Sequence, residues 1–350
     1  MSGTAKKAID AQEQLVSDSL GIRTFLGIPA VIASPAMRRV MQFAAKIAPS
    51  NAAVLITGES GSGKEIVARA IHEHSLRAGK PWIDINCAAL PDHLLESELF
   101  GFEKGAFSGA EMGKPGMFEL AHQGTLFLDE ISELSLRSQS KLLRVLDGCP
   151  YFRLGGTRKI DVSVRIVAAT NAELETSVQE GKFRPDLFFR LNQVRLTVPP
   201  LRDRKEDIEP LARLFLSQER PELGISEDAL AVLRCFAWPG NVRELKSLLA
   251  RLAVVVDGPE IRPQDLPTEM QAVACETPEV ETHSLNRLEQ EVIFHALEQA
   301  AGRRDRAAQM LGISRRTLIR RLKLYGVSQN HGRVCANPPA SWSAETAEEC

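Results

Sequence analysis

The segment GESGSGKE, residues 58–65, constrains this chain more than any other. It follows the β-rich run AAVLIT and precedes EIVARAIHEH, which has a helical pattern. In such a strand–loop–helix unit, glycines let backbone N–H groups face phosphate oxygens, and the helix N-terminus adds a positive dipole end. The segment therefore predicts a phosphate-binding loop of the Walker A type inside an α/β fold.

Lys64 is the residue of this loop expected to reach the β and γ phosphates of a nucleotide. Glu65 stands where the general pattern has Ser or Thr for magnesium. A purely structural loop is the weaker alternative, because the motif sits in its required context. The loop residues predicted to bind the nucleotide are Gly58, Glu59, Ser60, Gly61, Ser62, Gly63, Lys64 and Glu65.

A second motif is the apolar run TLFLD, which leads into Asp129 and Glu130. An acidic pair at the end of a buried strand is typical of a Walker B motif. Asp129 would hold Mg²⁺ through water, and Glu130 would polarise the attacking water. Taken alone, the pair fits a helix cap better, but beside a phosphate loop we favour Walker B. The sequence therefore predicts ATP and Mg²⁺ as cofactors.

The chain alternates β-rich and helical patterns from Ile28 to about Pro200, which predicts a parallel α/β sheet. The expected strands are residues 52–57, 82–86, 125–129, 164–170 and 193–198. The pattern then becomes helical only. We expect a short N-terminal segment (1–26), an α/β domain (27–200), a helical subdomain (201–267), a linker (268–283), a helical domain (284–328) and a disordered tail (329–350).

The C-terminal part of the chain concentrates positive charge. Residues 302–324 hold eight Arg or Lys against Asp305 alone, a formal charge of about +7, whereas the whole chain carries −2. The pattern predicts two helices separated by a turn at Gly312, with Ser314 capping the second helix. Leu318, Leu322 and Tyr325 of that helix are expected to face a core. A basic second helix predicts major-groove binding to double-stranded DNA, although a solvated helix face is the alternative. The predicted contacts are Arg315, Arg316, Thr317, Arg320, Arg321 and Lys323.

Two further features need a function. Arg184 and Arg190, six residues apart, could supply positive charge to a γ-phosphate from a neighbouring subunit, or could be surface ion-pairing residues. Phe107 lies in GAFSGA among small residues, where a single exposed ring would make one large apolar contact. A Phe folded back into its own core is the alternative.

These motifs together resemble those of bacterial enhancer-binding proteins, the AAA+ activators of sigma-54 RNA polymerase of the nitrogen regulatory protein C class. The resemblance covers about residues 28–267, and the C-terminal helical domain resembles the Fis-type DNA-binding domain of that family. It is carried in order by GESGSGKE, ELFGFEKGAFSGA, GTLFLDE, ATN, FRPDLFFRLN and WPGNVREL.

The resemblance implies roles for residues that spacing alone leaves open. Glu65 is normal for the family. Asn86 resembles the residue that holds the catalytic glutamate inactive, and Asn171 resembles sensor I. Arg184 and Arg190 resemble trans-acting arginine fingers. Arg243 resembles sensor II in a lid subdomain and would bind the nucleotide.

The resemblance also implies a role for the loop that contains Phe107. In the family this loop rises during hydrolysis and contacts the sigma-54 factor. The implied contact residues are Gly105, Ala106, Phe107, Ser108, Gly109 and Ala110. Ser108 replaces the usual Thr, and Phe189 replaces a common Tyr. Because neither change removes a catalytic group, we expect function to be retained.

The expected protein is thus an ATP-hydrolysing activator that binds upstream DNA, remodels the sigma-54 polymerase closed complex and assembles as dimers to hexamers. It resembles the short activators of the family, so we expect control by a separate regulatory protein or by expression level. No apolar run reaches membrane-span length, so we expect a cytoplasmic protein without a membrane partner. A repressor whose ATPase domain only oligomerises is the alternative, but the loop, Glu130 and both arginines argue against it. Another AAA+ machine would not explain GAFSGA beside a helix-turn-helix.

Overall fold

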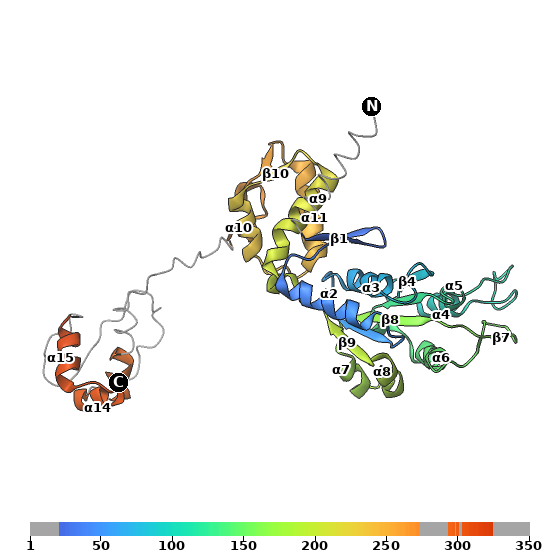
Figure 1. Ribbon diagram of the computed structural model, residues 1–350, viewed down its shortest axis with the longest axis horizontal. Helices are drawn as coiled ribbons and strands as arrows, with labels where there is room; N and C mark the ends of the chain where they lie inside the picture. The colour runs from blue at the N-terminus through green and yellow to red at the C-terminus, as the bar shows by residue number, and fades with distance from the viewer. Residues whose placement is uncertain (1–20, 273–292, 298, 301–302, 325–350) are drawn as a thin grey trace. The chain divides into compact units, whose positions relative to one another are not determined.

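The computed structural model describes residues 21–272, 293–297, 299–300 and 303–324 (Figure 1). The chain divides into two compact units, Met1–Ala274 and Cys275–Cys350. Within the described residues, no helix is both long and apolar enough to cross a bilayer.

The centre of the first unit is a five-stranded parallel sheet with the order β4-β5-β8-β3-β9. All five strands expected from the sequence are confirmed, two of them with the expected bounds and three with ends shifted by one or two residues. Their bounds are β3 Val54–Thr57, β4 Trp82–Asn86, β5 Thr125–Asp129, β8 Arg165–Thr170 and β9 Val194–Thr197.

Helices cover both faces of this sheet. Side chains of β8 alternate between two core clusters: Ile166 and Ala168 join one, and Val167 and Ala169 join the other. The first cluster includes α4 (Asp92–Phe100), α6 (Leu136–Leu146) and α8 (Pro185–Leu191), and the second includes α2 (Pro35–Ile47) and α3 (Lys64–Glu73). Burial on both faces explains the continuous apolar run of β8. In Figure 1, α2 and α3 lie on one side of the sheet, and α7 (Leu174–Gln179) and α8 lie on the other.

A hairpin that the sequence did not predict precedes α2. The expected N-terminal segment 1–26 includes β1 (Ile22–Phe25), which pairs antiparallel with β2 (Ile28–Val31). Leu26 and Gly27 form the turn with φ of 46° and 81°. Phe25 and Ala30 are buried in the core cluster of α2 and α3, and Val31 is buried in a second core cluster, so apolar side chains of both strands attach the hairpin to the domain.

The second part of this unit is helical, as expected. Its helices α9 (Ile208–Glu219), α10 (Glu227–Cys235) and α11 (Asn241–Val255) share one core that includes the fully buried Trp238. A short parallel pair, β10 (Gly224–Ile225) and β11 (Glu260–Ile261), adds to the helices. The predicted linker 268–283 is wrong for its first residues, because α12 (Thr268–Ala272) buries Met270 in the same core.

The second unit contains α14 (Arg304–Met310) and α15 (Arg315–Leu324). Leu318 and Leu322 are buried with Ala307 and Ala308, which confirms the predicted core face. Gly312 has a φ of 63° at the turn between the helices. Tyr325 and the tail 329–350 lie outside the described residues.

Candidate functional site

The two nucleotide-site motifs meet at the carboxyl edge of the sheet. The loop 58–63 follows β3, Asp129 ends β5, and Asn171 follows β8. Because β5, β8 and β3 are adjacent and parallel, their carboxyl ends lie side by side. This edge is where open α/β sheets bind ligands.

Glycines shape the phosphate loop. Gly58, Gly61 and Gly63 have φ of 152°, 71° and 96°, values that side chains disfavour. A Cβ on Gly61 would lie 2.5 Å from the carbonyl oxygen of Gly240, whereas a Cβ on Gly63 would meet nothing within 4 Å. The Oγ of Ser62 is buried without a hydrogen-bond partner among the described residues. A loop with open space and a free donor at the N-terminus of α3 fits a nucleotide phosphate.

Lys64 joins the two motifs. Its side chain is buried, and its Nζ donates to the carbonyl oxygens of Gly58 at 2.9 Å and Glu59 at 3.3 Å. The same nitrogen lies 3.7 Å from Oε1 of Glu130. The ammonium group therefore lies between the phosphate loop and the second acidic residue of the other motif.

Glu130 and Asp129 occupy different surroundings. Glu130 has a left-handed backbone with a φ of 52°, and its Oε2 accepts a hydrogen bond from the Asn171 backbone N–H at 3.1 Å. Asp129 Oδ1 accepts from the Glu130 backbone N–H at 3.1 Å. Burial, then the charge of Glu130, raises the pKa of Asp129, while Lys64 opposes this. Carboxylate oxygens are the ligands that Mg²⁺ prefers, so this residue fits the metal role.

The side chain of Asn86 contacts Asp129, the first residue of the acidic pair, and not Glu130. The two residues are paired in register across β4 and β5, and Asn86 Nδ2 donates to Asp129 Oδ2 at 3.4 Å. Asn86 therefore contacts Asp129 in this structure, because adjacent strands set the pairing, and its role toward the catalytic glutamate stays a prediction. The Asn171 backbone N–H contacts Glu130 instead.

The side chain of Glu65, the last residue of the predicted nucleotide-binding segment, pairs with Arg69 of α3. Its Oε1 accepts from Arg69 Nε at 2.9 Å and Nη2 at 2.7 Å, and its side chain is exposed. The one-turn spacing of the two residues on α3 favours this pair over the phosphate loop.

The N-terminus of α11 contacts the phosphate loop. Arg243 Nη1 donates to Ser60 Oγ at 2.8 Å, and the Val242 backbone N–H donates to the Gly61 carbonyl at 3.0 Å. The predicted sensor residue is therefore next to the loop that would hold the nucleotide.

Two residues that the sequence analysis did not select connect the same parts. Arg202 donates to both carboxylate oxygens of Glu59, at 2.9 and 2.5 Å, and Asn241 Nδ2 donates to Glu59 Oε2 at 3.0 Å. These hydrogen bonds, with Arg202 first, lower the pKa of Glu59 to about 2. Asn241 lies in the quoted WPGNVREL, but its partner lies 182 residues away, so no local pattern identifies the contact.

A series of buried polar contacts, made by Arg204, Asp207 and Ser34, lies next to these hydrogen bonds. Arg204 donates to the Ser62 carbonyl and lies 3.9 Å from Asp207, with both side chains almost fully buried. Asp207 accepts from the backbone N–H groups of Ala33 and Ser34, at 2.8 and 2.6 Å, and from Ser34 Oγ at 2.9 Å. Ser34 caps α2. These contacts join the phosphate loop, the helical subdomain and α2.

The two candidate arginine fingers lie at α8: Arg184 directly precedes the helix and is partly exposed, and Arg190 lies in its last turn and is exposed. Arg184 pairs with Asp186 at 2.6 Å, and Arg190 lies 3.3 Å from Asp147. Both side chains therefore have acidic neighbours in their own chain, as the surface ion-pair alternative expects. Their exposure also leaves them accessible to a second subunit.

The loop with Phe107 is closed by its own backbone. Gly105 N–H donates to the Ala110 carbonyl at 2.9 Å, and Gly105 and Gly109 have φ of 83° and 103°. The Phe107 side chain is 46% exposed, and its ring lies 4.9 Å from the ring of Phe102. Phe107 is thus not folded into a core, and one side of its ring faces solvent.

The base of this loop is fixed by two neighbouring backbone segments. Phe102 bridges to Lys114 and to Leu154, and Leu154 follows β6 (Tyr151–Phe152) in a hairpin with β7 (Lys159–Ile160). A Cβ on Gly155 would lie 2.9 Å from Ala106. The hairpin therefore packs closely against the start of the GAFSGA loop.

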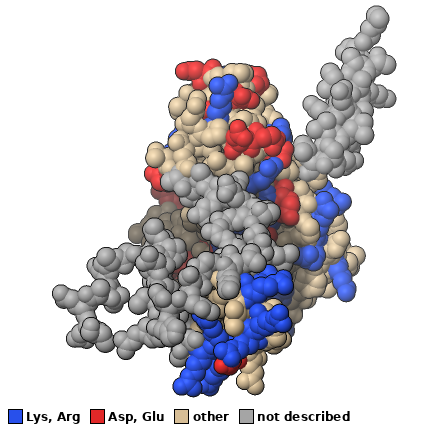
Figure 2. All heavy atoms as spheres, turned by 90° about the vertical axis from the view of Figure 1, so that its left-hand side faces the viewer, with Lys and Arg blue, Asp and Glu red and all other residues tan. Residues whose placement is uncertain are grey.

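The second unit presents a basic helix. In α15, Arg315, Arg316, Thr317 and Arg320 are exposed and Arg321 is partly buried, while the side chain of Lys323 lies outside the described residues. Ser314 Oγ caps the helix by accepting from the Thr317 N–H at 3.1 Å. Arg315 lies 3.0 Å from Asp305. Figure 2 shows Lys and Arg gathered in its lower part with little acidic surface among them.

Three family descriptions match consecutive parts of the chain. They are "Sigma-54 interaction domain" over residues 30–197, "AAA+ ATPase lid domain" over residues 202–283 and "Bacterial regulatory protein, Fis family" over residues 284–325. The second match begins close to the expected subdomain boundary and extends through the predicted linker.

Known regulators resemble most of the chain. The regulatory protein AtoC of Escherichia coli K12 is 49% identical over 308 residues, which cover 84% of this chain and 67% of AtoC. The DNA-binding transcriptional regulator NtrC of the same organism is 44% identical over 325 residues, covering 84% of this chain and 69% of NtrC. A crystal structure of NtrX from Brucella abortus in complex with ATP has a TM-score of 0.64 and 37% identity, covering 93% of this chain and 75% of NtrX.

Proposed function

This chain belongs to the sigma-54 activator family of AAA+ transcription regulators, and we propose that it uses ATP hydrolysis to open promoters held by sigma-54 RNA polymerase. The observation that carries the proposal is the half-exposed ring of Phe107. Its loop belongs to the same domain in which Lys64 of the Walker A loop contacts Glu130 of Walker B. An ATPase that only oligomerised would have no use for this ring.

The residues of the site divide the work of hydrolysis. Bound ATP with Mg²⁺ supplies the phosphoanhydride bond that water cleaves. The glycine loop and Lys64 would hold its phosphates, Asp129 would hold the metal, and Glu130 would orient the attacking water. Asn171 positions Glu130 through its backbone N–H. Arg243 of the lid contacts the loop and joins the nucleotide-binding set.

Assembly completes the site in this proposal. Arg184, directly before α8, and Arg190, in its last turn, would reach the nucleotide of a neighbouring subunit, where a guanidinium stabilises charge on the transferred phosphoryl group. The assembly is a ring, a hexamer by analogy with the family, built from dimers that bind DNA.

Nucleotide state would reach the loop through α4. Asn86 ends β4 next to Asp129, and the Cys87 N–H donates to the Asp129 carbonyl at 2.9 Å. The chain then forms α4, which ends at Phe100 directly before the loop. A change at Asp129 on hydrolysis would therefore pass through these hydrogen bonds to Asn86 and Cys87, and along α4 to the loop with Phe107, which would contact the sigma-54 factor.

The basic α15 would anchor the protein on upstream double-stranded DNA. Its exposed arginines suit both phosphate and base-edge contacts. Control by a separate regulatory protein, in the cytoplasm, remains part of the proposal.

The test is promoter opening by purified sigma-54 holoenzyme, followed by permanganate reactivity of unpaired thymines. We expect opening with this protein and ATP, and none with this protein and a non-hydrolysable ATP analogue. Equal opening without the protein, or none with it and ATP on several sigma-54 promoters that carry its binding site, would contradict the proposal.

A further inference from the structure

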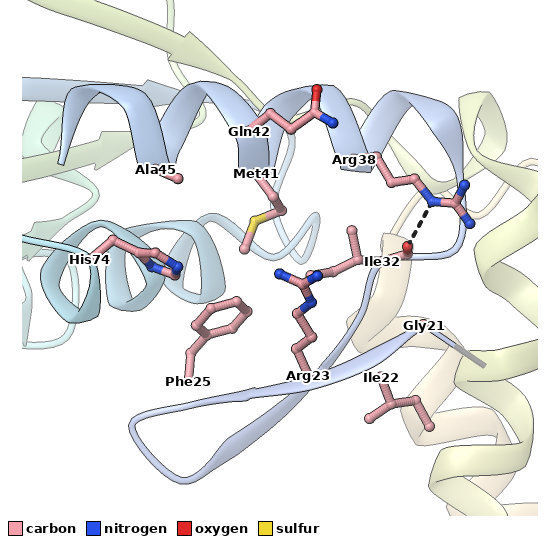
Figure 3. A pocket seen from close by; sticks show the side chains of 10 residues that line it. All are labelled: Gly21, Ile22, Arg23, Phe25, Ile32, Arg38, Met41, Gln42, Ala45 and His74. Atoms are coloured by element: carbon pink, nitrogen blue, oxygen red, sulfur yellow. Dashed lines mark hydrogen bonds between the residues drawn. The ribbon is translucent and has the colours of Figure 1, made fainter. Parts of the chain in front are cut away.

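A cavity of about 390 Å³ lies between the β1–β2 hairpin, α2 and the end of α3 (Figure 3). Its apolar lining includes Phe25, Ile32 and Met41. Its polar lining includes Arg23 and Arg38, with Gln42 and His74. A mostly apolar cavity with a few polar groups is the usual form of a small-molecule site, and its volume is in the range of such sites.

This cavity is separate from the nucleotide site. His74 caps the C-terminal end of α3, whereas Lys64 begins that ten-residue helix. Ten helical residues span about 15 Å, so the two sites lie at opposite ends of the helix.

The hairpin is a fixed wall of the cavity. Phe25 is 3% exposed, the Leu26 N–H donates to Glu73 Oε2 at 3.1 Å, and the Ile32 N–H donates to the Gly21 carbonyl at 2.9 Å. The turn of the hairpin is thus attached to α3, and the Gly21–Ile32 hydrogen bond holds its two strands together at the base. A preformed wall lowers the entropic cost of binding.

The charges at the cavity are unbalanced. Figure 3 shows the Arg23 guanidinium between Phe25 and Ile32, pointing toward α2. Within the described part of the chain, no carboxylate pairs with Arg23 or Arg38, and the Arg38 guanidinium donates only a 3.4 Å hydrogen bond, from Nε to the Ile32 carbonyl. The one carboxylate noted beside the hairpin, Glu73, accepts from its turn. Two guanidinium groups therefore have donors available for an anion.

The aromatic side chains at the cavity indicate which apolar group a bound anion would carry. The rings of Phe25 and His74 have centroids 6.0 Å apart and are tilted by 48°. His74 Nδ1 lies 2.8 Å from the Ala70 carbonyl, so Nδ1 carries hydrogen and Nε2 is left for a ligand or water. A planar ring against Phe25 would place an attached anionic group within reach of the arginines.

We propose that this cavity is a binding site for a small aromatic anion, a ring that carries a carboxylate or a phosphate. Binding there needs no ATP turnover, so the inference stands apart from the proposed function and the two can fail separately.

The test is calorimetric titration of the full chain with phenyl phosphate and with benzoate, in saturating Mg–ADP so that the Walker A loop is filled. One or both probes should bind to the wild type. The R23Q/R38Q variant should bind at least about tenfold more weakly, because it loses charge-assisted hydrogen bonds. R39Q changes an exposed arginine of α2 outside the lining and should bind like the wild type. Comparing the two probes distinguishes a phosphate from a carboxylate ligand.

Phenol and inorganic phosphate, the two halves of the probe, should each bind at least about tenfold more weakly than phenyl phosphate. Thermal unfolding of each variant checks that it is folded. The proposal is overturned if the wild type binds neither aromatic anion, if R23Q/R38Q binds them as tightly as the wild type, or if inorganic phosphate alone binds equally well.

Discussion

Glu130 is the residue on which hydrolysis depends in this account, since Lys64 lies 3.7 Å from one of its oxygens and the Asn171 N–H contacts the other. We expect Glu130→Gln to lower ATP turnover about 10²–10⁴-fold, because an amide cannot act as a base toward water. ATP binding should persist, since Lys64 and the loop are unchanged. Steady-state hydrolysis and fluorescent-nucleotide binding measure the two effects. Glu133→Gln is the matched control, and undiminished turnover of Glu130→Gln would contradict the Walker B assignment.

The contact of Glu59 with Arg202 and Asn241, called the lid contact below, should make the stability of the protein depend on pH. Its pKa is about 2 in the folded protein against an ordinary value of 4.5, so its contribution is complete above pH 4.5 and is lost as the pH falls toward 2. Glu59→Gln should lower the thermal midpoint at pH 7 by about 1–3 °C, because the ion pair with Arg202 is exposed. That difference should shrink at pH 4 and further at pH 3.

Thermal unfolding of the wild type and Glu59→Gln across this pH series measures the effect. Glu219→Gln, at an exposed position, is the control and should show no such trend. A wild-type advantage that stays constant from pH 7 to pH 3 would remove Glu59 from the lid contact.

At the scale of elements, Arg204 links the phosphate loop, the lid and α2. Its side chain is buried with Asp207, so Arg204→Met would leave a buried carboxylate without its cation. We expect a loss of about 3–5 kcal/mol in the free energy of unfolding. Arg202→Met, which removes an exposed ion pair, should cost far less. Urea unfolding of both variants makes the comparison, and similar losses would contradict the role of the buried polar contacts.

The sequence predicted the elements that local patterns define and missed those that depend on distant contacts. Each strand of the sheet is a β-rich run, so all five were identified. The β1–β2 hairpin was not, because IRTFLGIPAV includes Pro29 and mostly exposed or partly exposed residues. Its buried side chains, Phe25, Ala30 and Val31, pack in clusters formed largely by residues distant in the sequence.

The same reason applies to the site. The Walker motifs are local and were placed correctly at one sheet edge. Arg202 and Arg204 contact loop residues 143 and 142 positions away, so sequence spacing gave no sign of them. Asn86 and Glu65 were assigned from position in a motif, whereas strand register and a one-turn helix pair determine their partners.

At the scale of the whole assembly, the arginines of α8 should act in trans. Arg190→Ala and Lys64→Ala should each lower ATP turnover by about 10³-fold or more. Arg190→Ala removes the arginine finger, and Lys64→Ala removes the lysine that would contact the phosphates. Mixing the two should restore part of the activity, since Arg190→Ala subunits keep the loop and Lys64→Ala subunits keep the arginine.

Steady-state turnover of the mixture, against each variant alone, is the measurement. A mixture of Arg190→Ala with the double variant Arg190→Ala/Lys64→Ala is the control and should stay inactive. If the first mixture is no more active than its components, Arg190 belongs to the surface ion-pair interpretation with Asp147.

The central claim is that hydrolysis acts on sigma-54 polymerase through the ring of Phe107. The most direct measurement is open-complex formation by sigma-54 holoenzyme with Phe107→Ala, alongside its ATP turnover and DNA binding. Met112→Ala, at an 80% exposed position of the same segment, is the matched control. We predict that Phe107→Ala keeps turnover and DNA binding within about twofold of the wild type, yet opens no promoter, because it loses the apolar anchor of the contact. Promoter opening by Phe107→Ala at the wild-type level would contradict the account.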